Sequence, residues 1–247
     1  MRKALLTGKF LKRKSSMKPG SGLKRIGLLL WLFIGALAIR GQDNSGQFPP
    51  AWEQSGNLAD IVTQLTRYHD YGQYDFEIRQ VADAARDYAG RRIQEAGKDE
   101  KLAAVFDIDE TSLSNWEAMS GCGFCSYSAQ AKLYPDTHDP AIVPVLELYN
   151  FVKGKGVKTF FLTGRKESQR DATAKNLKDA GYEGWEDLIM RPNDDAEPAR
   201  VFKPARRQVI AAKGYTIILN IGDQASDLAG CCAERSFKLP NPFYLVP

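Results

Sequence analysis

The stretch LAAVFDIDETSLSN, residues 102–115, carries an apolar run directly into the acidic side chains of Asp107, Asp109 and Glu110. A buried strand more often ends at a turn residue such as Gly or Asn, or at a single Asp. Neighbouring carboxylates repel one another, and each disfavours ionisation of the next. We therefore expect a cation or a bound ligand to balance the charge at this point of the fold.

Beyond residue 101, short apolar runs alternate with helical patterns. We expect strands at residues 102–107, 157–162, 187–190 and 216–221, and helices at residues 141–154, 167–180 and 204–213. Such alternation is typical of an α/β fold, and it predicts a parallel sheet with helices on both faces. Two earlier helical patterns, one starting at Leu58 and one running from Phe76 to Ala96, predict an N-terminal helical extension.

One segment after the first strand, Trp116 to Pro140, fits no sheet element. We interpret about residues 112–140 as a small cap insertion over the site. Its aromatic side chains could form the core of the cap or face a substrate, and they are Trp116, Phe124, Tyr127 and Tyr134.

The first 41 residues have the composition of a signal peptide. Nine Lys or Arg residues lie between Met1 and Arg25, and an uncharged apolar run of 14 residues follows at 26–39. That run is shorter than the roughly 20 residues of a transmembrane helix. We predict cleavage and a secreted or periplasmic location, with an uncleaved signal anchor as the alternative. Membrane association is expected only through this leader. Residues 42–57 are interpreted as a linker to a domain at residues 58–247.

The leader also explains the net charge of +4. Residues 1–42 hold ten of the 34 Lys and Arg residues and none of the 30 acids, so the remainder has 24 basic and 30 acidic residues and a net charge of −6. No basic stripe interleaved with aromatic residues follows the leader. A nucleic acid polymer is therefore not expected as a partner.

All four cysteines follow the leader, as two close pairs. The spacing of Cys122 and Cys125 could indicate a zinc or redox motif, but Cys231 and Cys232 are adjacent, which is poor spacing for a second zinc knuckle. In an exported protein we expect at least one structural disulfide involving Cys122 or Cys125.

Polar side chains stand at the ends of the other predicted elements, and they are Thr163, Gly164 and Arg165, then Lys203, then Asp223 and Asp227. In open parallel sheets the active site lies beyond the carboxyl ends of the strands. These segments should therefore meet the acids of the first strand at one edge of the sheet.

The two aspartates that follow the first apolar run suggest two different catalytic roles. Residues two apart in a strand point to the same side, so we expect Asp107 and Asp109 to face the site together. One such carboxylate can act as nucleophile and the other as general acid and base. Asp223 and Asp227 would add two acids, and this set of oxygen ligands suits Mg²⁺ with a phosphate completing its coordination.

A phosphate would also find its own ligands among these motifs. Thr163 offers a hydroxyl group, and we expect backbone N–H groups near Gly164 at a helix start. Lys203 offers a positive charge for the oxygens of a transferring phosphoryl group. The sequence therefore predicts chemistry on a phosphate ester.

Taken in order, Asp107-x-Asp109-x-Thr111, Thr163-Gly164-Arg165, Lys203 and Gly222-Asp223-xxx-Asp227 resemble the four motifs of the haloacid dehalogenase superfamily of phosphohydrolases. The longer forms FDIDETSLSNW, FFLTGR, FKPARR and IGDQASD, with the ending FKLPNPFY, resemble its class B and plant-type acid phosphatase branch. The likeness covers about residues 58–244.

The resemblance implies a Rossmann-like core for the α/β fold. It also implies an acid phosphatase in which Asp107 is the nucleophile, forming an aspartyl-phosphate, and Asp109 is the acid and base. It also implies Mg²⁺ held by Asp107, the backbone carbonyl of Asp109 and Asp223, with Asp227 supporting. The sequence departs from the family pattern at Phe202-Lys203-Pro204, where relatives often have Tyr-Lys-Ser. Because proline is accepted at the first position of a helix, we expect Lys203 to keep its place.

Other functions remain open. A phosphotransferase could use the same scaffold, and so could a storage or binding protein with weak or no catalysis, although the latter would be expected to lose Asp107. A retaining glycosidase is disfavoured, because two acids two residues apart would not flank a sugar ring. The expected substrate is a small phosphomonoester, which the sequence does not identify further.

Overall fold

The computed structural model describes residues 56–126, 129–130 and 138–246, all within one compact unit, Pro49–Pro247. The predicted leader, most of the predicted linker, and the cap residues Tyr127 and Tyr134 lie outside the described residues.

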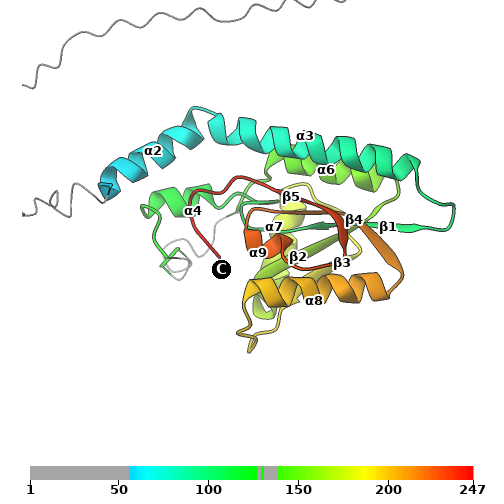
Figure 1. The fold of residues 1–247 in the computed structure, drawn as a ribbon. Helices are drawn as coiled ribbons and strands as arrows, with labels where there is room; N and C mark the ends of the chain where they lie inside the picture. Colours follow the sequence, from blue (N-terminus) through cyan, green and yellow to red (C-terminus); the bar gives the residue numbers. More distant parts are fainter. Residues whose placement is uncertain (1–55, 127–128, 131–137, 247) are drawn as a thin grey trace, which may run out of the picture. The chain divides into compact units, whose positions relative to one another are not determined.

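A parallel sheet of five strands forms the centre of this unit (Figure 1). Its strand order is β3-β2-β1-β4-β5, and every neighbouring pair is parallel. The strands are β1 Lys101–Phe106, β2 Lys158–Lys166, β3 Asp187–Arg191, β4 Tyr215–Gly222 and β5 Ala233–Lys238. The chain builds β2 and β3 on one side of β1 before returning to add β4 and β5 on the other. The crevice where the strand order reverses, at the carboxyl ends of β1 and β4, is where ligands bind in such sheets.

Helices cover both faces of the sheet, as predicted. The longer helices are α2 Leu58–Asp70, α3 Gln73–Gln94, α6 Val143–Gly154, α7 Arg170–Asp179 and α8 Ala199–Ala212. In Figure 1, α3 and α6 run above the sheet and α8 runs below it. The predicted N-terminal extension is thus confirmed as α2 and α3, which are joined at Gly72 with a positive φ of 79°.

Alternation along β1 explains how one strand serves both faces. Ala104 and Phe106 belong to the core beneath α3 and α6, whereas Ala103 and Val105 belong to the core beneath α8. Successive residues of a strand point to opposite sides, and here both sides are buried. An apolar strand without polar alternation is therefore the pattern that a central parallel strand requires.

Three expectations about local structure were wrong. Helix α8 begins at Ala199 and not at residue 204, so Pro204 lies inside the helix rather than at its first position. Strand β2 continues to Lys166, so Gly164 lies in the strand and not at a helix start. Strand β1 ends at Phe106, so Asp107 and Asp109 follow the strand, and the alternation of a strand does not set their directions.

The sheet also has an edge strand that the sequence did not suggest. In β5 only Phe237 is buried, while Glu234, Arg235, Ser236 and Lys238 are exposed. Within the predicted insertion the structure describes a short helix, α4 Trp116–Gly121. A disulfide joins Cys122 to Cys125 directly after this helix, and a second joins the adjacent Cys231 and Cys232.

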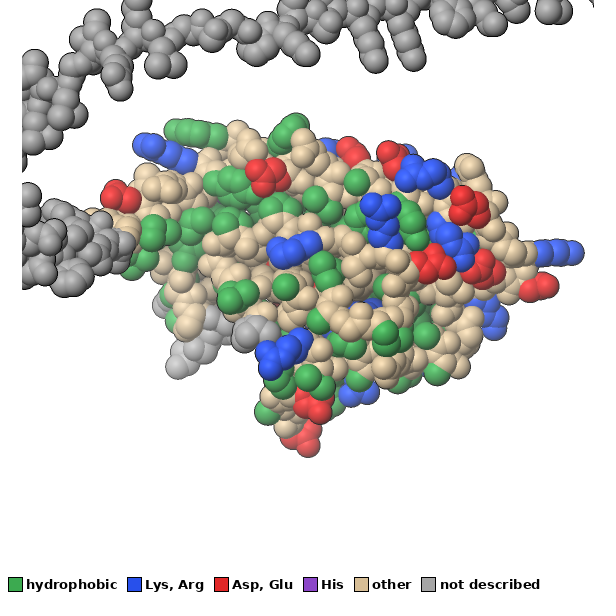
Figure 2. Space-filling view, viewed as in Figure 1, with side chains coloured by type: hydrophobic (Ala, Val, Ile, Leu, Met, Phe, Trp, Pro, Cys, Tyr) green, Lys and Arg blue, Asp and Glu red, His purple; other side chains and the backbone are tan. Residues whose placement is uncertain are grey.

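Exposed apolar side chains mark one part of the surface. Figure 2 shows hydrophobic side chains gathered over α2 and the start of α3. Leu58 is 73% exposed, Ile61 42% and Phe76 56%, and helix α2 contains no buried residue. The buried core of the extension therefore begins with Tyr74 in α3.

Candidate active site

The ammonium group of Lys203 lies between two carboxylates, with Nζ 2.5 Å from Oδ1 of Asp107 and 2.5 Å from Oδ1 of Asp227. Their side chains are buried, with exposed fractions of 5% for Lys203, 8% for Asp107 and 4% for Asp227. Burial alone would lower the pKa of Lys203, but the attraction of both aspartates outweighs it and raises the pKa. Lys203 therefore stays charged and ties α8 to the ends of β1 and β4.

Local packing fixes Lys203 in this position. The next residue, Pro204, packs so closely on Gly230 that a Cβ atom added at Gly230 would lie 2.7 Å from Cβ of Pro204. Gly230 also has a φ of 79°, which disfavours other residues. One turn further along α8, the buried Arg207 donates to the backbone carbonyls of Asp227, Ala229 and Cys231. The loop that follows α9 (Ala225–Leu228) is thereby bound to the helix that carries Lys203.

Asp107 sits in surroundings that disfavour a negative charge. Burial, followed by repulsion from Asp227, raises the pKa of Asp107 well above its usual value, although Lys203 opposes the shift. Its second oxygen, Oδ2, accepts no hydrogen bond from any residue within the described ranges. A carboxylate with one oxygen unengaged and with too little positive charge nearby is suited to a further cation or an electrophile.

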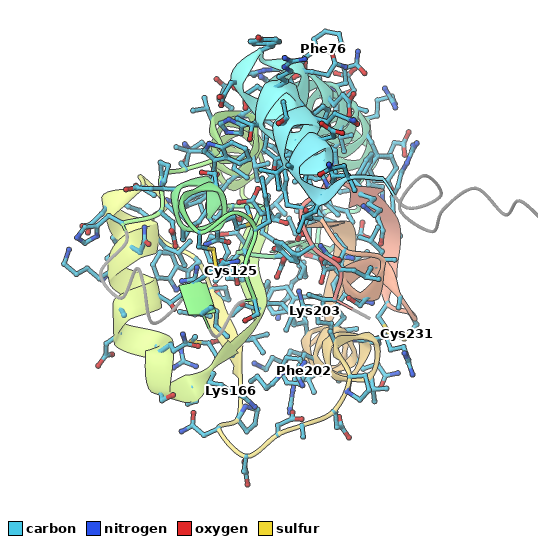
Figure 3. The ribbon with its side chains drawn as sticks, turned by 90° about the vertical axis from the view of Figure 1, so that its left-hand side faces the viewer. Phe76, Cys125, Lys166, Phe202, Lys203 and Cys231 are labelled. Carbon is cyan, nitrogen blue, oxygen red and sulfur yellow. A yellow bond between two sulfur atoms is a disulfide. The ribbon has the colours of Figure 1, made fainter. Side chains whose placement is uncertain are left out.

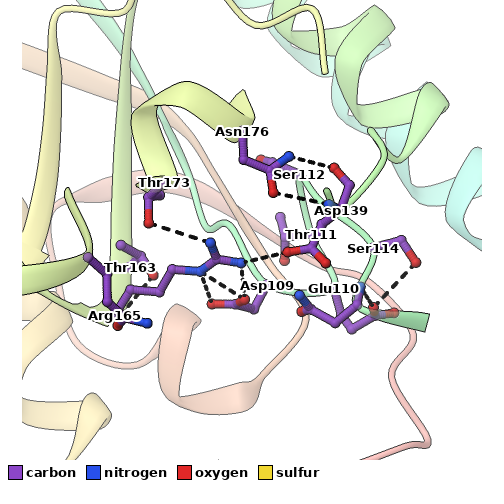
Figure 4. A network of polar contacts seen from close by, with 12 residues as sticks. Asp109, Glu110, Thr111, Ser112, Ser114, Asp139, Thr163, Arg165, Thr173 and Asn176 are labelled. Atoms are coloured by element: carbon purple, nitrogen blue, oxygen red, sulfur yellow. Dashed lines mark hydrogen bonds and ion pairs between the residues drawn. The ribbon is translucent and has the colours of Figure 1, made fainter. Parts of the chain in front are cut away.

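Asp109 has a different partner from Asp107 (Figure 4). Arg165, at the end of β2, donates from Nη2 at 2.7 Å and from Nε at 3.1 Å to Oδ1 of Asp109. Burial would raise the pKa of Asp109, but the charge and hydrogen bonds of Arg165 outweigh it and lower the pKa. The two aspartates of the motif thus stand in separate ion pairs, one with Lys203 and one with Arg165.

The end of the insertion is attached to the same arginine. Arg165 also donates from Nη2 to Oδ2 of Asp139 at 3.2 Å. The side chain of Asn176 in α7 holds the backbone of Asp139 on both sides, accepting from its N–H at 3.0 Å and donating to its carbonyl at 2.7 Å. Asp139 therefore links the insertion to Asp109 through Arg165 (Figure 4). The sequence placed Arg165 in a motif without assigning it a role and did not single out Asp139.

Asp223, at the end of β4, completes the acidic group. It accepts from Oγ1 of Thr111 at 3.1 Å and from the side-chain amides of Gln224 and Asn241, each at 2.6 Å. Burial, followed by the charge of Asp227, raises its pKa. Carboxylate oxygens of Asp107, Asp223 and Asp227 lie within 4.8 Å of one another, which is close enough for all three to contact one metal ion.

The contacts of Asp227 differ from those of the other two acids. Its Oδ1 contacts Lys203, and its Oδ2 accepts from the backbone N–H of Gln224 at 2.8 Å. The charge of Lys203 already offsets that of Asp227, so Asp227 is better suited to supporting a metal site than to direct ligation. Asp109 is likewise paired with Arg165, whereas Asp223 accepts from neutral donors only and Asp107 has one oxygen unengaged, so Asp107 and Asp223 are the most suitable carboxylate ligands among the four predicted acids.

The two predicted phosphate ligands in β2 lie differently. Thr163 is fully buried, and its Oγ1 accepts from the backbone N–H of Arg165 at 3.0 Å. Gly164 is exposed and lines the cavity at this edge of the sheet. A side chain at position 164 would stand in that cavity, so glycine leaves room there for a ligand.

The acids open into a cavity of about 600 Å³. One wall carries Met119, Phe124 and Gln130 of the insertion, and another carries the C-terminal residues Tyr244 and Leu245. Of the predicted cap residues, Phe124 therefore lines the cavity. Trp116 does not: it stacks on His69 with ring centroids 3.7 Å apart and packs on Phe243 in the core of this region. The cavity is therefore lined by apolar side chains on its walls and by the charged side chains of the site at its base.

Glu110 is a buried acid whose role the sequence did not reveal. It has a φ of 48° and no exposed surface, and its Oε2 accepts from the hydroxyl group of Tyr74 in α3 at 2.5 Å. Its Oε1 accepts from the backbone N–H of Asn115 at 2.5 Å. Burial raises the pKa of Glu110 to about 7, although these hydrogen bonds oppose the shift. Glu110 therefore ties the helical extension to the loop that holds Asp107 and Asp109.

The sheet, its acidic motifs after β1 and β4, and the lysine supplied by α8 are together the architecture of the haloacid dehalogenase (HAD) class of phosphohydrolases. Residues 51–247 match the family described as HAD superfamily, subfamily IIIB (Acid phosphatase). The chain belongs to this acid phosphatase family and so to the phosphoric monoester hydrolases, as the sequence predicted.

Individual relatives agree with this assignment. The chain is 39% identical to Acid phosphatase 1 of Solanum lycopersicum over 179 residues, which are 70% of this chain and 69% of that protein. It is 30% identical to Vegetative storage protein 2 of Arabidopsis thaliana over 208 residues, 78% of this chain and 77% of that protein. The structure of the class C acid phosphatase from Bacillus anthracis superposes with a TM-score of 0.63 at 21% identity, covering 76% of this chain and 86% of that one, which shows a shared fold.

The Tyr74–Glu110 contact leads to a prediction about stability. Tyr74→Phe keeps the buried ring but leaves a buried acceptor without its donor, so it should lower the free energy of unfolding by about 1–3 kcal/mol. Tyr71→Phe is the matched control, because Tyr71 is 81% exposed, and it should change the free energy by less than about 0.5 kcal/mol. Urea unfolding measures both. Equal midpoints for the two variants would show that the contact contributes nothing.

Proposed function

We propose that this acid phosphatase is an exported, Mg²⁺-dependent enzyme that cleaves small phosphomonoesters, with Asp107 as nucleophile and Asp109 as general acid and base. The observation that carries the proposal is the placement of the two acids at one cavity in different ion pairs, Asp107 with Lys203 and Asp109 with Arg165. A nucleophile needs an unengaged oxygen, and Asp107 has one. A proton-transfer group needs a partner that orients it, and Asp109 has Arg165.

Residues from α8 and β2 would bind the phosphate group from different sides. Lys203 would contact its oxygens from α8, and the chain around Gly164 lines the other side of the cavity. Thr163 would act through its position beneath Gly164 and Arg165, since its hydroxyl group already accepts from the backbone. These groups would hold the phosphorus atom within reach of Oδ2 of Asp107.

The chemical steps follow from these positions. Arg165 holds Asp109 as a carboxylate in this structure, so Asp109 must exchange its contact with Arg165 for a proton before the first step. Oδ2 of Asp107 then attacks the phosphorus atom, the ester bond breaks, and the leaving oxygen takes the proton from the carboxyl group of Asp109. The aspartyl-phosphate is then attacked by water, which gives its proton to the carboxylate of Asp109, and phosphate leaves while Asp107 is restored. Arg165 would orient the carboxylate of Asp109 in the second step.

A metal ion fits the residues present. The four aspartates outnumber Lys203 and Arg165 by two negative charges, and hard carboxylate and carbonyl oxygens are the ligands that Mg²⁺ prefers. Asp107, Asp223 and the backbone carbonyl of Asp109 would hold the ion, with Asp227 supporting it. When bound, Mg²⁺ would offset the charge of the acids and of the phosphate group.

A storage role without catalysis is the competing function, because one relative is named a vegetative storage protein. The residues of this chain favour catalysis, since Asp107 is present with one oxygen unengaged and lies beside Lys203 at an open cavity. A protein that only stored amino acids would need none of these contacts.

Export is inferred from the leader and from the cysteines. No helix within the described ranges is long and apolar enough to cross a bilayer. Both cysteine pairs are joined as disulfides, and such bonds persist mainly in oxidising compartments. Protein recovered outside the cytoplasm should begin near residues 39–42 and contain no thiol that alkylates before reduction. N-terminal sequencing and mass mapping test this. A product that retains Trp31 would identify the leader as an anchor.

Metal removal gives the most direct test of the cofactor. Treatment with EDTA should abolish phosphate release, because the acids around Asp107 then repel the incoming dianion, and added Mg²⁺ should restore it. Phosphate release from p-nitrophenyl phosphate is measured before, during and after chelation. Full activity in metal-free buffer would contradict the magnesium site while leaving the acid phosphatase assignment intact.

Separate substitutions distinguish the two aspartates. Asp107→Asn should reduce hydrolysis of every phosphomonoester to background, because the attacking oxygen is lost. Asp109→Asn should slow alkyl phosphates by about 10²–10⁴-fold but p-nitrophenyl phosphate less, because its phenolate leaves without a proton. The aryl substrate should then show a burst of nitrophenol, since the base for the second step is also missing.

A matched control separates these effects from loss of charge on the surface. Asp171→Asn changes an exposed aspartate in α7 and should leave both substrates unaffected. If Asp109→Asn instead slows both substrates equally, without a burst and in proportion to weakened Mg²⁺ binding, then Asp109 acts through the metal and not as an acid and base.

A further inference from the structure

Two basic side chains, Lys166 and Arg191, line the outer part of the active-site cavity. Lys166 is the last residue of β2 and Arg191 the last of β3, and the register of the sheet pairs them directly. Figure 3 labels Lys166 and Lys203, and both residues line this cavity. The mechanism proposed above uses neither Lys166 nor Arg191.

Lys166 has no acidic partner among the residues that the structure describes. Its ammonium group donates only to backbone carbonyls, to Pro192 at 3.3 Å and to Asp195. A carbonyl group orients an ammonium group but does not neutralise its charge. Since the side chain is partly buried and lines the cavity, its positive charge acts on whatever occupies the cavity.

Contacts of Nη1 hold the guanidinium group of Arg191 in place, and its other two nitrogens are available as hydrogen-bond donors. One nitrogen, Nη1, donates to the carbonyl of Glu197 and lies 3.5 Å from Oδ1 of Asp195, and the guanidinium stacks 4.7 Å from the ring centre of Phe202. Neither Nε nor Nη2 donates to any residue in the described part of the chain. Arginine presents such paired donors to the oxygens of phosphate and carboxylate groups.

The charges of the cavity are therefore separated in space. The inner part holds Asp107, Asp223 and Asp227 around Lys203, where a divalent cation would be needed to balance the acids. The outer part, over β2 and β3, holds Lys166 and Arg191 with Asp195 as the acid that contacts Arg191. A substrate with a single phosphate group would satisfy the inner part alone and leave the outer charges to water.

The structure assigns Lys166 and Arg191 to a second anion-binding subsite, and we infer that the favoured substrates are phosphomonoesters carrying another anionic group, phosphate or carboxylate. The inference rests on the proposed function for the cleaved phosphate. Phe106 pairs with Phe161, so Asp107 is level with Leu162, and Lys166 lies four residues beyond. At about 3.3 Å per residue, and allowing for the irregular register, the two anionic groups would be on the order of 10 Å apart.

A set of alkyl phosphates tests the subsite. Hexyl phosphate has one anionic group, whereas 1,6-hexanediol bisphosphate and 7-phosphonooxyheptanoate carry a second at the far end of the chain. After correction for its two equivalent esters, the bisphosphate should have a kcat/KM about tenfold above that of hexyl phosphate, as expected for charged hydrogen bonds. The carboxylate compound shows whether the subsite accepts any anion or requires phosphate.

Substitution then locates the effect. Lys166→Met should reduce the ratio of bisphosphate to monophosphate kcat/KM toward one, and Lys166→Arg should retain it. Lys175→Met, which removes an exposed lysine of α7 outside the cavity, should leave the ratio unchanged. A lysine that only fastened the chain at Pro192 and Asp195 would lower both rates together without changing their ratio. Lys166→Gln, which keeps a donor for these carbonyls, replaces Lys166→Met if the latter does not fold.

Binding of uncleavable analogues separates this inference from the function on which it rests. Calorimetry with hexylphosphonate and 1,6-hexanediphosphonate in Mg²⁺ should show tighter binding of the diphosphonate, and Lys166→Met should remove the difference. If neither phosphate ester is cleaved but this difference persists, the proposed function fails and the subsite stands. If the wild-type protein treats the paired compounds alike in both assays, the subsite is refuted whatever the variants show.

Discussion

The contact of Lys203 with Asp107 and Asp227 is the interaction on which the rest of the site depends. It joins a helix from one face of the sheet to the ends of β1 and β4, and all three side chains are buried. Burying charges is costly unless they are paired, so removing Lys203 would leave two buried carboxylates without their counter-charge. The close packing of Pro204 on Gly230 and the backbone contacts of Arg207 hold this group in place. The same contacts therefore hold both the α8 region and the site in place.

The site contains two sets of charged side chains, one around Asp107 and one around Asp109, and these sets shift the pKa values of the two aspartates in opposite directions. Around Asp107, burial and a second carboxylate raise the pKa, whereas Arg165 lowers the pKa of Asp109 two residues further on. The chain leaves the strand after Phe106, which lets these neighbours turn toward different partners. Asp139 extends the second group into the insertion, so the segment that lines the cavity is coupled to the orientation of Asp109. Two acids of identical type at one cavity thus differ in their ionisation because their surroundings differ.

The sequence predicted the central features because their signals are local. An uninterrupted apolar run predicts a buried parallel strand, and acids at its end predict a site, so β1, Asp107 and the parallel arrangement of the sheet could be predicted. Strand β5 was missed because only Phe237 among its residues is buried, which leaves no apolar run or alternation to detect. The start of α8 was misplaced because Pro204 was interpreted as a first helical residue, and tertiary packing on Gly230 overrides that preference. Arg165 contacts Asp139 and Glu110 contacts Tyr74, and because these partners are distant in the sequence, no local pattern predicts the contacts.

The separation of charge across the cavity follows from the topology. Strands β1 and β4 flank the point where the strand order reverses, and the acids lie there. Strands β2 and β3 end further along the same edge, and their last residues are the basic Lys166 and Arg191. A ligand that spans the edge would therefore lie against an acidic region around Lys203 and then against a basic region formed by Lys166 and Arg191. The apolar side chains of Phe124 and Leu245 line the same cavity and suit the carbon skeleton of such a ligand. Because each region comes from different strands, the residues that end β2 and β3 can be substituted without changing the aspartates that follow β1 and β4.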